Sequence, residues 1–533
     1  MNKVIISQTK QQIFCQSGDN LRTVLLKAGV FIESPCAGKG LCGKCKVKIV
    51  SGNVSSMTKT EKDLLGKDEI QQGIRLACLT EVDGDVELEI LYKERTHKVL
   101  TKGYLPNFER ENQNKGYGVV VDIGTTTVVL GLIHLASGKE IATASALNAQ
   151  KQYGLDVLSR ITYEYENPED GVQQLQKTIV QLLNQLLYDV CVQARIDRKD
   201  VKEIDISANC TMMHMLLGED AKSIGRAPYK PVFTEAKRIR AKEIGIEAGE
   251  DTMLYCLPAV SAYIGADIVA GAYVCELQKE TGNVLFVDIG TNGEIVLTVD
   301  GRLFCCSCAA GPALEGMNIS SGMRASEGAI EDVYLTETGI QLEIIGEQEP
   351  IGICGSGILA AIREGLNTKI IKKNGVFIKK ETLEQSDYRY SFIRKNGNKR
   401  EFLLSEDPEI VVTQADVRQV QLAKGAILSG FVGLLNQAGI CMEELQKVIV
   451  AGQFGSHLPK ESLIGVGILP REVEERLVYV GNSSKTGAYM ALMSETVKKE
   501  MEELAQKMEY IELSQIPNYE QIFAKSMIFP EEQ

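Results

Sequence analysis

A four-residue motif, Asp-Ile-Gly-Thr, occurs twice in this chain and stands both times between two apolar segments. The first copy begins at Asp122, after Val-Val-Val and before a run of valines and leucines. The second begins at Asp288, after Val-Leu-Phe-Val and before a similar run. Each copy predicts a buried strand, a tight turn and a returning strand. A motif repeated in the same setting predicts that most of the chain consists of two related halves.

The two turns have the composition of a phosphate-binding loop. Backbone N–H groups that follow one another in a tight turn form a concave site for an anion, and threonine hydroxyls add donors. The residues predicted to contact a nucleotide here are Gly124, Thr125, Thr126 and Thr127 in the first turn and Gly290, Thr291, Asn292 and Gly293 in the second. A single turn of this kind is common in ordinary hairpins, so the prediction depends on the duplication.

A third glycine turn follows an apolar segment late in the chain and contains Gly452, Gln453 and Phe454. Together with the two phosphate turns it predicts a pocket for adenosine. The pattern G-x4-G-K-[ST] does not occur in the sequence, so the predicted nucleotide site is not a P-loop.

Four carboxylates are candidates for the catalytic groups of this site: Asp122, Asp288, Glu294 and Asp267. Asp122 and Asp288 end buried strands, where a carboxylate can hold Mg²⁺ through water. Glu294 follows the second turn, and Asp267 lies on an apolar helix predicted around residues 259–274. Either of these two can position the attacking water. A solvated carboxylate without a catalytic role is the alternative for both.

Four cysteines near the N-terminus have the spacing of a metal site. Cys36, Cys42 and Cys45 share one glycine-rich loop, and Cys78 follows before a later strand. The [2Fe–2S] ferredoxins of plant type use C-x4-C-x2-C with a distant fourth cysteine, and this loop has one residue more. Zinc ribbons use two separate C-x2-C pairs, of which this region has one, so zinc is the less favoured alternative. The four cysteines are therefore predicted to ligate a [2Fe–2S] cluster.

Composition excludes several classes of protein. The net charge of −13 disfavours a non-specific nucleic-acid binder. The sequence has no apolar run long enough to span a membrane, and the N-terminus lacks the apolar core of a signal peptide. Fourteen cysteines spread through a long chain without such a signal favour a cytoplasmic protein, most of whose thiols are buried.

The pattern predicts four successive regions. Residues 1–93 are expected to form a small mixed sheet around the cysteine loop, and 94–116 a polar, flexible linker. Residues 117–280 and 281–533 are expected to form the two related halves, with an insertion of short strands and charged turns near 331–410. Lys424, on an otherwise apolar predicted helix, is open to two interpretations, a nucleotide contact or a structural role.

The three turns resemble those of the ATPase superfamily that contains actin, sugar and acetate kinases and heat-shock chaperones. Joined to an N-terminal ferredoxin region, the chain is similar over nearly its whole length to ATP-dependent reductive activators of corrinoid proteins. Further stretches carry the same resemblance, among them Asn209–His214, Gly311–Gly316 and Gly481–Ser484. The resemblance implies a mixed α/β and α+β protein, in which a β-grasp ferredoxin domain precedes a two-lobed, actin-like ATPase domain built from a duplicated RNase H-like fold.

The same resemblance implies a function. Such activators use a [2Fe–2S] cluster, ATP and Mg²⁺ to reduce Co(II) to Co(I) in the corrinoid protein of a methyltransferase system. The implied partners are that corrinoid protein and a low-potential electron donor, a ferredoxin or a flavoprotein, with no nucleic acid and no membrane; a homodimer is one arrangement left open. Two alternatives remain at this point: an ATP-switched module that binds a metalloprotein, and a small-molecule kinase with a ferredoxin domain.

Overall fold

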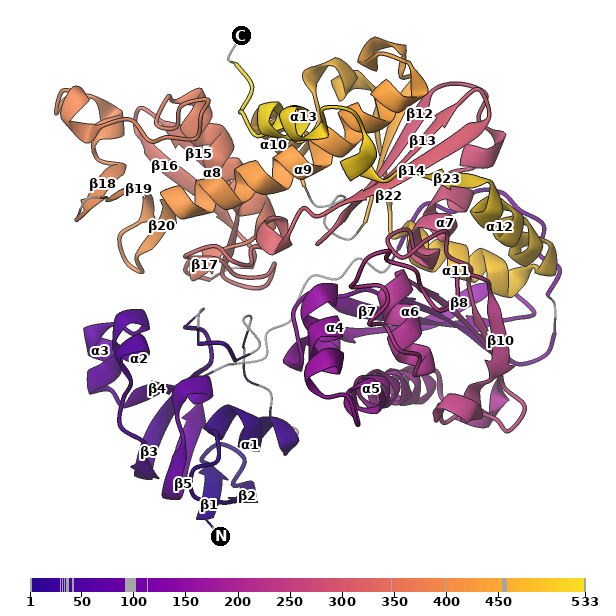
Figure 1. The fold of residues 1–533 in the computed structure, drawn as a ribbon, viewed down its shortest axis with the longest axis horizontal. Coiled ribbons are helices and arrows are strands. Elements are labelled where there is room, and N and C mark those ends of the chain that lie inside the picture. Colours follow the sequence, from indigo (N-terminus) through magenta and orange to yellow (C-terminus); the bar gives the residue numbers. More distant parts are fainter. Residues whose placement is uncertain are drawn as a thin grey trace. The chain divides into compact units, whose positions relative to one another are not determined.

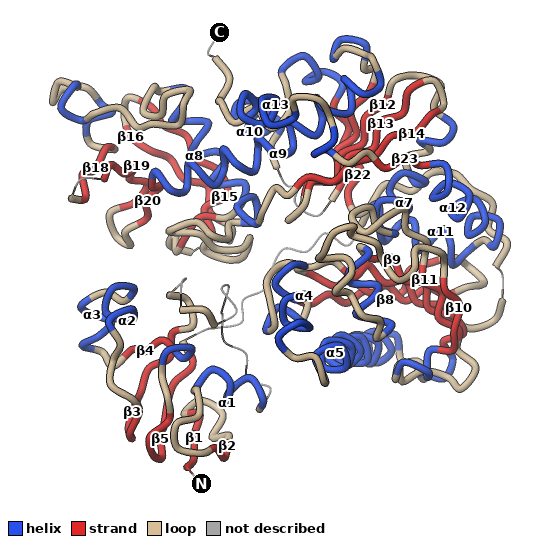
Figure 2. Tube along the Cα trace, in the orientation of Figure 1, coloured by secondary structure: helices blue, strands red, loops and turns tan. Residues whose placement is uncertain are grey.

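The computed structural model describes residues 2–28, 30, 32, 34, 38–40, 43–91, 102–112, 114–346, 348–397, 399–452 and 458–531. The chain divides into two compact units, Met1–Arg95 with Ala149–Ile179, and Thr96–Asn148 with Val180–Gln533. Figures 1 and 2 show the elements of both units, each of which has its own sheets. None of the described helices combines the length and apolar character that a membrane crossing requires.

The N-terminal sheet of the first unit is a five-stranded mixed sheet. Its strands lie in the order β2 (Gln12–Cys15), β1 (Asn2–Ile6), β5 (Val82–Ile90), β3 (Lys46–Val54) and β4 (Ile74–Leu76). The β1–β5 pair is parallel, and the other pairs are antiparallel. Helix α1 (Leu21–Lys27) begins after Asn20, whose side chain accepts a hydrogen bond from the amide of Thr23. This arrangement is the β-grasp fold that the resemblance implied.

Four more helices begin in this unit. They are α2 (Lys59–Leu64), α3 (Lys67–Gln71), α4 (Val157–Glu166) and α5 (Gly171–Ala194), the last of which continues into the second unit. The apolar side of α1 packs into a core that includes Leu21, Leu25 and Leu88, each fully buried. Burial of these side chains stabilises the domain because apolar surface is removed from water.

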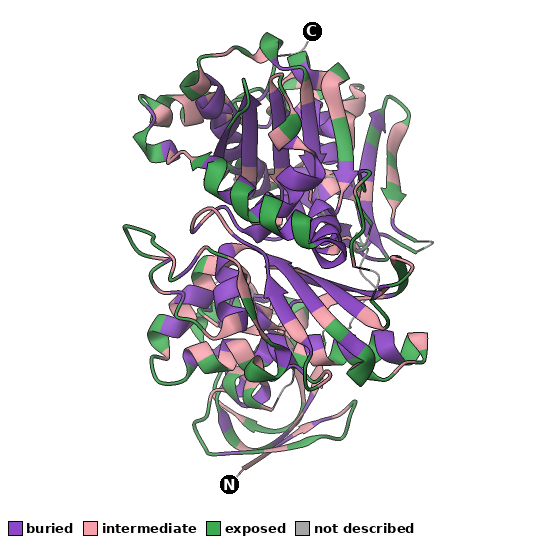
Figure 3. Ribbon diagram, turned by 90° about the vertical axis from the view of Figure 1, so that its right-hand side faces the viewer, coloured by how far each residue is buried: buried purple, intermediate pink, exposed green. Residues whose placement is uncertain are grey.

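The second unit contains two six-stranded sheets. The first has the order β10 (Lys237–Arg240), β11 (Met253–Cys256), β9 (Val201–Ala208), β6 (Tyr117–Ile123), β7 (Thr127–His134), β8 (Lys139–Leu147). The second has the order β22 (Leu477–Gly481), β21 (Lys447–Ala451), β12 (Val284–Ile289), β13 (Gly293–Val299), β14 (Arg302–Cys308), β23 (Met508–Tyr510). The inner strands β6, β7, β12 and β13 are buried along most of their length, as the apolar runs predict, whereas β8, β10 and β22 are largely exposed or half-buried. Figure 3 colours the chain by this burial.

The two sheets have the same internal topology. In each, three antiparallel strands in chain order are followed by a strand parallel to the first of them: β6, β7, β8 then β9, and β12, β13, β14 then β21. A further parallel strand follows, β11 or β22. The repeated motif therefore marks a true structural duplication, and the predicted two-lobed, RNase H-like fold is confirmed.

The duplication places both aspartates at equivalent ends of central strands. Asp122 is the penultimate residue of β6, beside Ser207 of the parallel strand β9, and Asp288 is the penultimate residue of β12, beside Ala451 of β21. Because parallel neighbours end at the same edge of a sheet, the segments after β9 and β21 reach the same place as the aspartates. Helix α6 (Cys210–Leu217) follows β9, and the Gly452 turn follows β21.

The region predicted as an insertion holds two small sheets and a helix that the sequence did not reveal. The sheets are β16 (Gly339–Ile344), β15 (Ala329–Thr336), β17 (Gly352–Ile353) and β18 (Ile393–Asn396), β19 (Lys399–Ser405), β20 (Ile410–Thr413). The expectation of strands and turns alone was wrong for α8 (Gly355–Asn367). Two glycines in its first turn disfavour the prediction of a helix from the sequence, because glycine has a low helix propensity.

The remaining helices of the second unit are α7 (Ala266–Val274), α9 (Gln414–Ala438), α10 (Lys460–Val466), α11 (Ser483–Met493), α12 (Glu495–Lys507) and α13 (Tyr519–Ser526). The segment after α12 also forms regular structure. β23 joins the second sheet beside β14, and α13 packs against α9. Both contacts join segments that are far apart in the chain, so a local sequence pattern cannot predict them.

The described part of the predicted linker, residues 102–112, belongs to the second unit and is hydrogen-bonded within it. The amide of Tyr104 donates to the carbonyl of Val480, and the amide of Asn482 donates to the carbonyl of Lys102. Gly103 lies so close that a Cβ there would meet the Asn482 carbonyl oxygen at 2.3 Å. Residues 102–104 therefore pack against the turn before α11, while 92–101 lie outside the described residues.

Lys424 of α9 has a structural role. Its Nζ donates to the carbonyl of Ser526, the last residue of α13, at 2.6 Å, and to that of Ile528 just beyond the helix, at 2.8 Å. The side chain is buried, and burial lowers its pKa from 10.5 to about 8. A buried ammonium at the end of a helix satisfies carbonyls that have no partner within the helix.

The lowered pKa of Lys424 predicts a pH dependence of stability. Between pH 8 and 10.5 the folded chain has released this proton while the unfolded chain still binds it, so the free energy of unfolding rises with pH. From pH 7.5 to 9.5 we expect Lys424 to contribute an increase of about 2 kcal/mol. The free energy of unfolding of the wild type and of Lys424→Met is measured by urea unfolding at pH 7.5 and at pH 9.5. The increase between the two pH values should be larger for the wild type. Equal increments would contradict the assignment.

Candidate functional site

Cys45 and Cys78 form the described part of the cysteine site. Their Sγ atoms lie 3.2 Å apart, and both side chains are buried. The hydrogen bond with Cys78 is the main reason why the pKa of Cys45 falls from 9.0 to about 7. A thiol with a lowered pKa suits a metal ligand, since the thiolate is the binding form. Cys36 and Cys42 lie outside the described residues.

Local structure around these thiols fits a cluster loop. Gly38, Gly40 and Gly43 all have positive φ, between +65° and +91°, where other residues are strained. Behind Cys78, the fully buried Glu61 accepts two hydrogen bonds from Arg75, at 2.9 and 3.0 Å. This ion pair fixes the strand that leads to Cys78, and the residues present fit a [2Fe–2S] cluster held by four thiolates.

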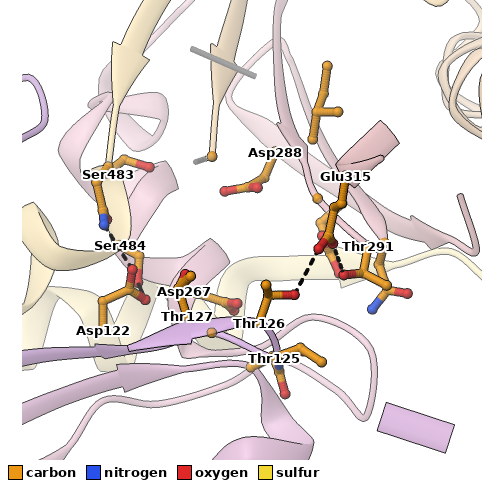
Figure 4. Close-up of a pocket in the computed structure, with 18 residues that line it drawn as sticks. Asp122, Thr125, Thr126, Thr127, Asp267, Asp288, Thr291, Glu315, Ser483 and Ser484 are labelled. Atoms are coloured by element: carbon orange, nitrogen blue, oxygen red, sulfur yellow. Dashed lines mark hydrogen bonds between the residues drawn. The ribbon is translucent and has the colours of Figure 1, made fainter. Parts of the chain in front are cut away.

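The second unit contains a polar pocket between its two halves, shown in Figure 4. The pocket is lined by Asp122, Gly124, Thr125, Thr126, Thr127, Asn209, Asp267, Asp288, Ile289, Gly290, Thr291, Asn292, Glu294, Glu315, Gly452, Asn482, Ser483 and Ser484. Both predicted phosphate turns and all four predicted carboxylates meet here. Gly293 does not line the pocket, because it begins β13 and packs toward Cys308. Gln453 and Phe454 lie outside the described residues.

Asp122 is oriented by a turn from the far end of the chain. Its two carboxylate oxygens accept hydrogen bonds from Asn482 Nδ2, at 2.9 Å, and Ser484 Oγ, at 2.7 Å. Asn482 also caps α11 by accepting from the amide of Lys485. The neighbouring Ser483 Oγ is buried and has no hydrogen-bond partner among the described residues.

Burial raises the pKa of all four predicted carboxylates in the pocket, and repulsion between carboxylates adds to the rise for Asp267, Asp288 and Glu294. Burial and then the Asp288 and Asp122 carboxylates raise the pKa of Asp267 to about 8. Burial and then Asp122 raise that of Asp288 to about 7. Burial also raises the pKa of Asp122 and, together with Asp267 and Asp288, that of Glu294. A divalent cation would relieve this repulsion and return the pKa values toward their ordinary range.

The pocket fits Mg²⁺ that arrives with phosphate and water. Among the described side chains, no three of His, Cys, Asp and Glu are grouped closely enough to hold a metal ion by themselves. Mg²⁺ sites commonly combine one or two carboxylates with waters and the phosphates of a nucleotide. The separated carboxylates of this pocket agree with that mode of binding.

Glu315 joins the two turns and is a pocket residue that sequence reasoning missed. It ends the short 3₁₀ segment Pro312–Glu315 and is buried. One carboxylate oxygen accepts from Thr126 Oγ1 at 2.9 Å, and the other accepts from Thr291 Oγ1. Figure 4 shows the carboxylate between these two hydroxyls. The position of Glu315 in the stretch Gly311–Gly316 was a signal, but its partners could not be read from the sequence.

Comparison with known proteins agrees with this arrangement. Residues 4–83 match the family "2Fe-2S iron-sulfur cluster binding domain", 117–280 match "RACo middle region", and 282–533 match "C-terminal domain of RACo the ASKHA domain". The "Corrinoid activation enzyme RamQ" of Eubacterium limosum is 32% identical over 444 residues, which are 82% of this chain and 74% of that protein. The chain belongs to the RACo family.

Two other relatives extend the comparison for this RACo-family chain. A solved structure of a "Reductive activator for corrinoid,iron-sulfur protein" has a TM-score of 0.69 and 30% identity, and the match covers 100% of this chain and 99% of that one. The "[Co(II) methylated amine-specific corrinoid protein] reductase" of Methanosarcina barkeri is 25% identical over 426 residues, 73% of this chain and 72% of that protein. The family predicted from the sequence is confirmed.

In this RACo-family site Gly452 leaves no room for a side chain. Its φ is +88°, and a Cβ would lie 2.3 Å from Asp288 Oδ1. We expect Gly452→Ala to displace Asp288 and to raise the Kd for ATP by about tenfold or more, measured by calorimetric titration. Gly301→Ala is the matched control, because Gly301 also has a positive φ, +75°, but nothing within 4 Å. If both variants lose the same affinity for ATP, the effect of Gly452→Ala is due to backbone strain and not to contact with Asp288.

Proposed function

We propose that this chain reactivates the corrinoid protein of a methyltransferase system, passing one electron from its [2Fe–2S] cluster to Co(II) to give Co(I) at the expense of ATP. The observation that carries the proposal is the presence, in one chain, of the cysteine site and the duplicated nucleotide pocket. The chain matches 99% of a solved reductive activator and 74% of a corrinoid activation enzyme. Bound to the four cysteines, the cluster would supply a one-electron carrier.

The need for ATP follows from redox energetics. Plant-type [2Fe–2S] centres have potentials near about −400 mV. For one electron a tenfold change in equilibrium constant corresponds to 59 mV. If the Co(II)/Co(I) couple lies ~200 mV below the potential of the cluster, the transfer costs about 4–5 kcal/mol. ATP can offset this only by favouring one state of the complex over another. We propose that closure of the two halves on the nucleotide grips the corrinoid partner and alters its cobalt ligation.

Roles for the pocket residues are part of the proposal. Asp122 and Asp288 hold Mg²⁺ through water, the two turns bind phosphate, and Asp267 or Glu294 positions the attacking water. Support comes from their meeting in one pocket and from the hydrogen bonds that orient Asp122. The turn at Gly452, with Gln453 and Phe454, is proposed to contact adenosine.

Further parts of the proposal concern the surroundings of the reaction. A low-potential ferredoxin or flavoprotein is the proposed electron donor, and a homodimer the proposed assembly. The twelve described cysteines are all free thiols, which supports action in a reducing compartment, the cytoplasm. The boundaries 1–93, 94–116, 117–280 and 281–533 stay predictions.

The experiment that tests the proposal measures ADP release by the purified chain in the presence of candidate partners. We expect a corrinoid protein in the Co(II) state to stimulate hydrolysis, and the same protein in the Co(I) state to do so much less. Stimulation by a sugar or a carboxylate instead would favour the kinase alternative. Complex formation that depends on ATP, without any change in the cobalt spectrum, would favour the binding-module alternative.

A further inference from the structure

Glu315 accepts hydrogen bonds from two threonine hydroxyls, the same donors that a phosphate bound between the turns would use. Thr126 comes from the first turn and Thr291 from the second, and both donate to the same carboxylate. A threonine hydroxyl has one proton to donate. While both protons point to Glu315, neither is available to a phosphate oxygen.

Electrostatic repulsion strengthens the competition between the Glu315 carboxylate and a phosphate for the two threonine hydroxyls. A carboxylate and a phosphate are both anions, and Glu315 lines the same pocket as Asp122, Asp267, Asp288 and Glu294. Glu315 is buried, so water screens its repulsion of a second anion only weakly. A phosphate that comes between the turns must therefore displace the carboxylate from both threonines.

The segment that carries Glu315 is anchored to the second half. The amide of Gly311 donates to the carbonyl of Thr291, and a Cβ on Gly355 would lie 1.7 Å from the carbonyl oxygen of Leu314. Glu315 thus belongs to the second half and reaches across to Thr126 of the first. Its contact with Thr126 is a bridge between the halves.

We propose that Glu315 is a specificity-determining residue that distinguishes nucleotides by their terminal phosphate. This inference rests on the proposed function of the pocket. The carboxylate stands in for the γ-phosphate by bridging the two turns when that phosphate is absent. ATP replaces the bridge with its terminal phosphate, whereas ADP is one phosphate shorter and leaves the bridge in place. Exchange of one bridge for the other makes the contact between the halves depend on the nucleotide.

The test compares the affinities for the β,γ-imido analogue of ATP and for ADP, measured by calorimetric titration of the full-length chain with Mg²⁺. In Glu315→Ala the triphosphate analogue no longer competes with a carboxylate, so we expect its affinity to rise relative to that of ADP by about tenfold or more. Glu315→Gln keeps the shape and one acceptor oxygen but loses the charge, so a smaller change in the same direction is expected. This second variant decides the matter if alanine prevents folding.

The outcomes distinguish a failure of the inference from a failure of the proposed function. If the wild type binds both nucleotides and the variants change both affinities by the same factor, Glu315 is only structural and the inference is wrong, while the nucleotide site stands. A selective loss of triphosphate affinity in the variants would also overturn it, because Glu315 would then assist the γ-phosphate. If the wild type binds neither nucleotide, the proposed function fails together with the inference.

Discussion

Replacing Cys45 with alanine is expected to abolish the reduction of Co(II) while ATP hydrolysis changes by less than about twofold. Cys45 is buried with its sulfur 3.2 Å from that of Cys78, so its removal takes away one of the four proposed thiolate ligands. Loss of the visible absorption and electron paramagnetic resonance signal of a [2Fe–2S] centre reports the cluster, and ADP release reports the pocket.

Cys15→Ser is the matched control for this prediction. Cys15 is a buried thiol of the same β-grasp domain but stands outside the predicted quartet. The control variant should keep the cluster signal and the reduction of Co(II). If Cys45→Ala loses ATP hydrolysis as well, the cysteine site is mainly structural and the proposed division of labour between cluster and pocket is wrong.

Asp288→Asn is expected to slow ATP hydrolysis by about 10²–10⁴-fold, the range for a positioned catalytic group. Asp288 ends β12 in the pocket, next to Gly452, and a neutral amide there would neither attract Mg²⁺ nor orient its water. Reduction of Co(II) should fall with hydrolysis, while the [2Fe–2S] spectrum is unchanged. The rate of ADP release at saturating ATP measures the effect.

Asp300→Asn controls for the loss of a negative charge in the same half. Asp300 is exposed in the turn between β13 and β14 and has a φ of +48°, which asparagine also tolerates. Hydrolysis by this variant should match the wild type. An Asp288→Asn protein that hydrolyses ATP at the wild-type rate would remove Asp288 from the proposed catalytic groups.

The sequence predicted those parts of the fold whose signal is local. Each Asp-Ile-Gly-Thr turn lies between apolar runs that form a hairpin by themselves, so the motif alone predicts that Asp122 and Asp288 end strands. The duplication then brings both to one pocket, since related halves end their central strands at equivalent edges. The cysteine spacing is informative for the same reason, because three of the four cysteines share one loop.

Residues whose role depends on distant partners could not be predicted in this way. Asn482 and Ser484 orient Asp122 across more than half of the chain, and Glu315 joins Thr126 to Thr291. The periodicity and spacing of a sequence do not predict such contacts, because they form only when distant segments pack together in the folded chain.

The measurement that tests the central claim most directly follows the cobalt itself. A corrinoid protein in the Co(II) state is mixed with the purified full-length chain and a chemical reductant, with and without ATP and Mg²⁺, and the Co(I) absorption band is recorded with time. The account predicts that Co(I) accumulates only with ATP, and that Cys45→Ala and Asp288→Asn both prevent it. Equal accumulation of Co(I) without ATP would contradict the account.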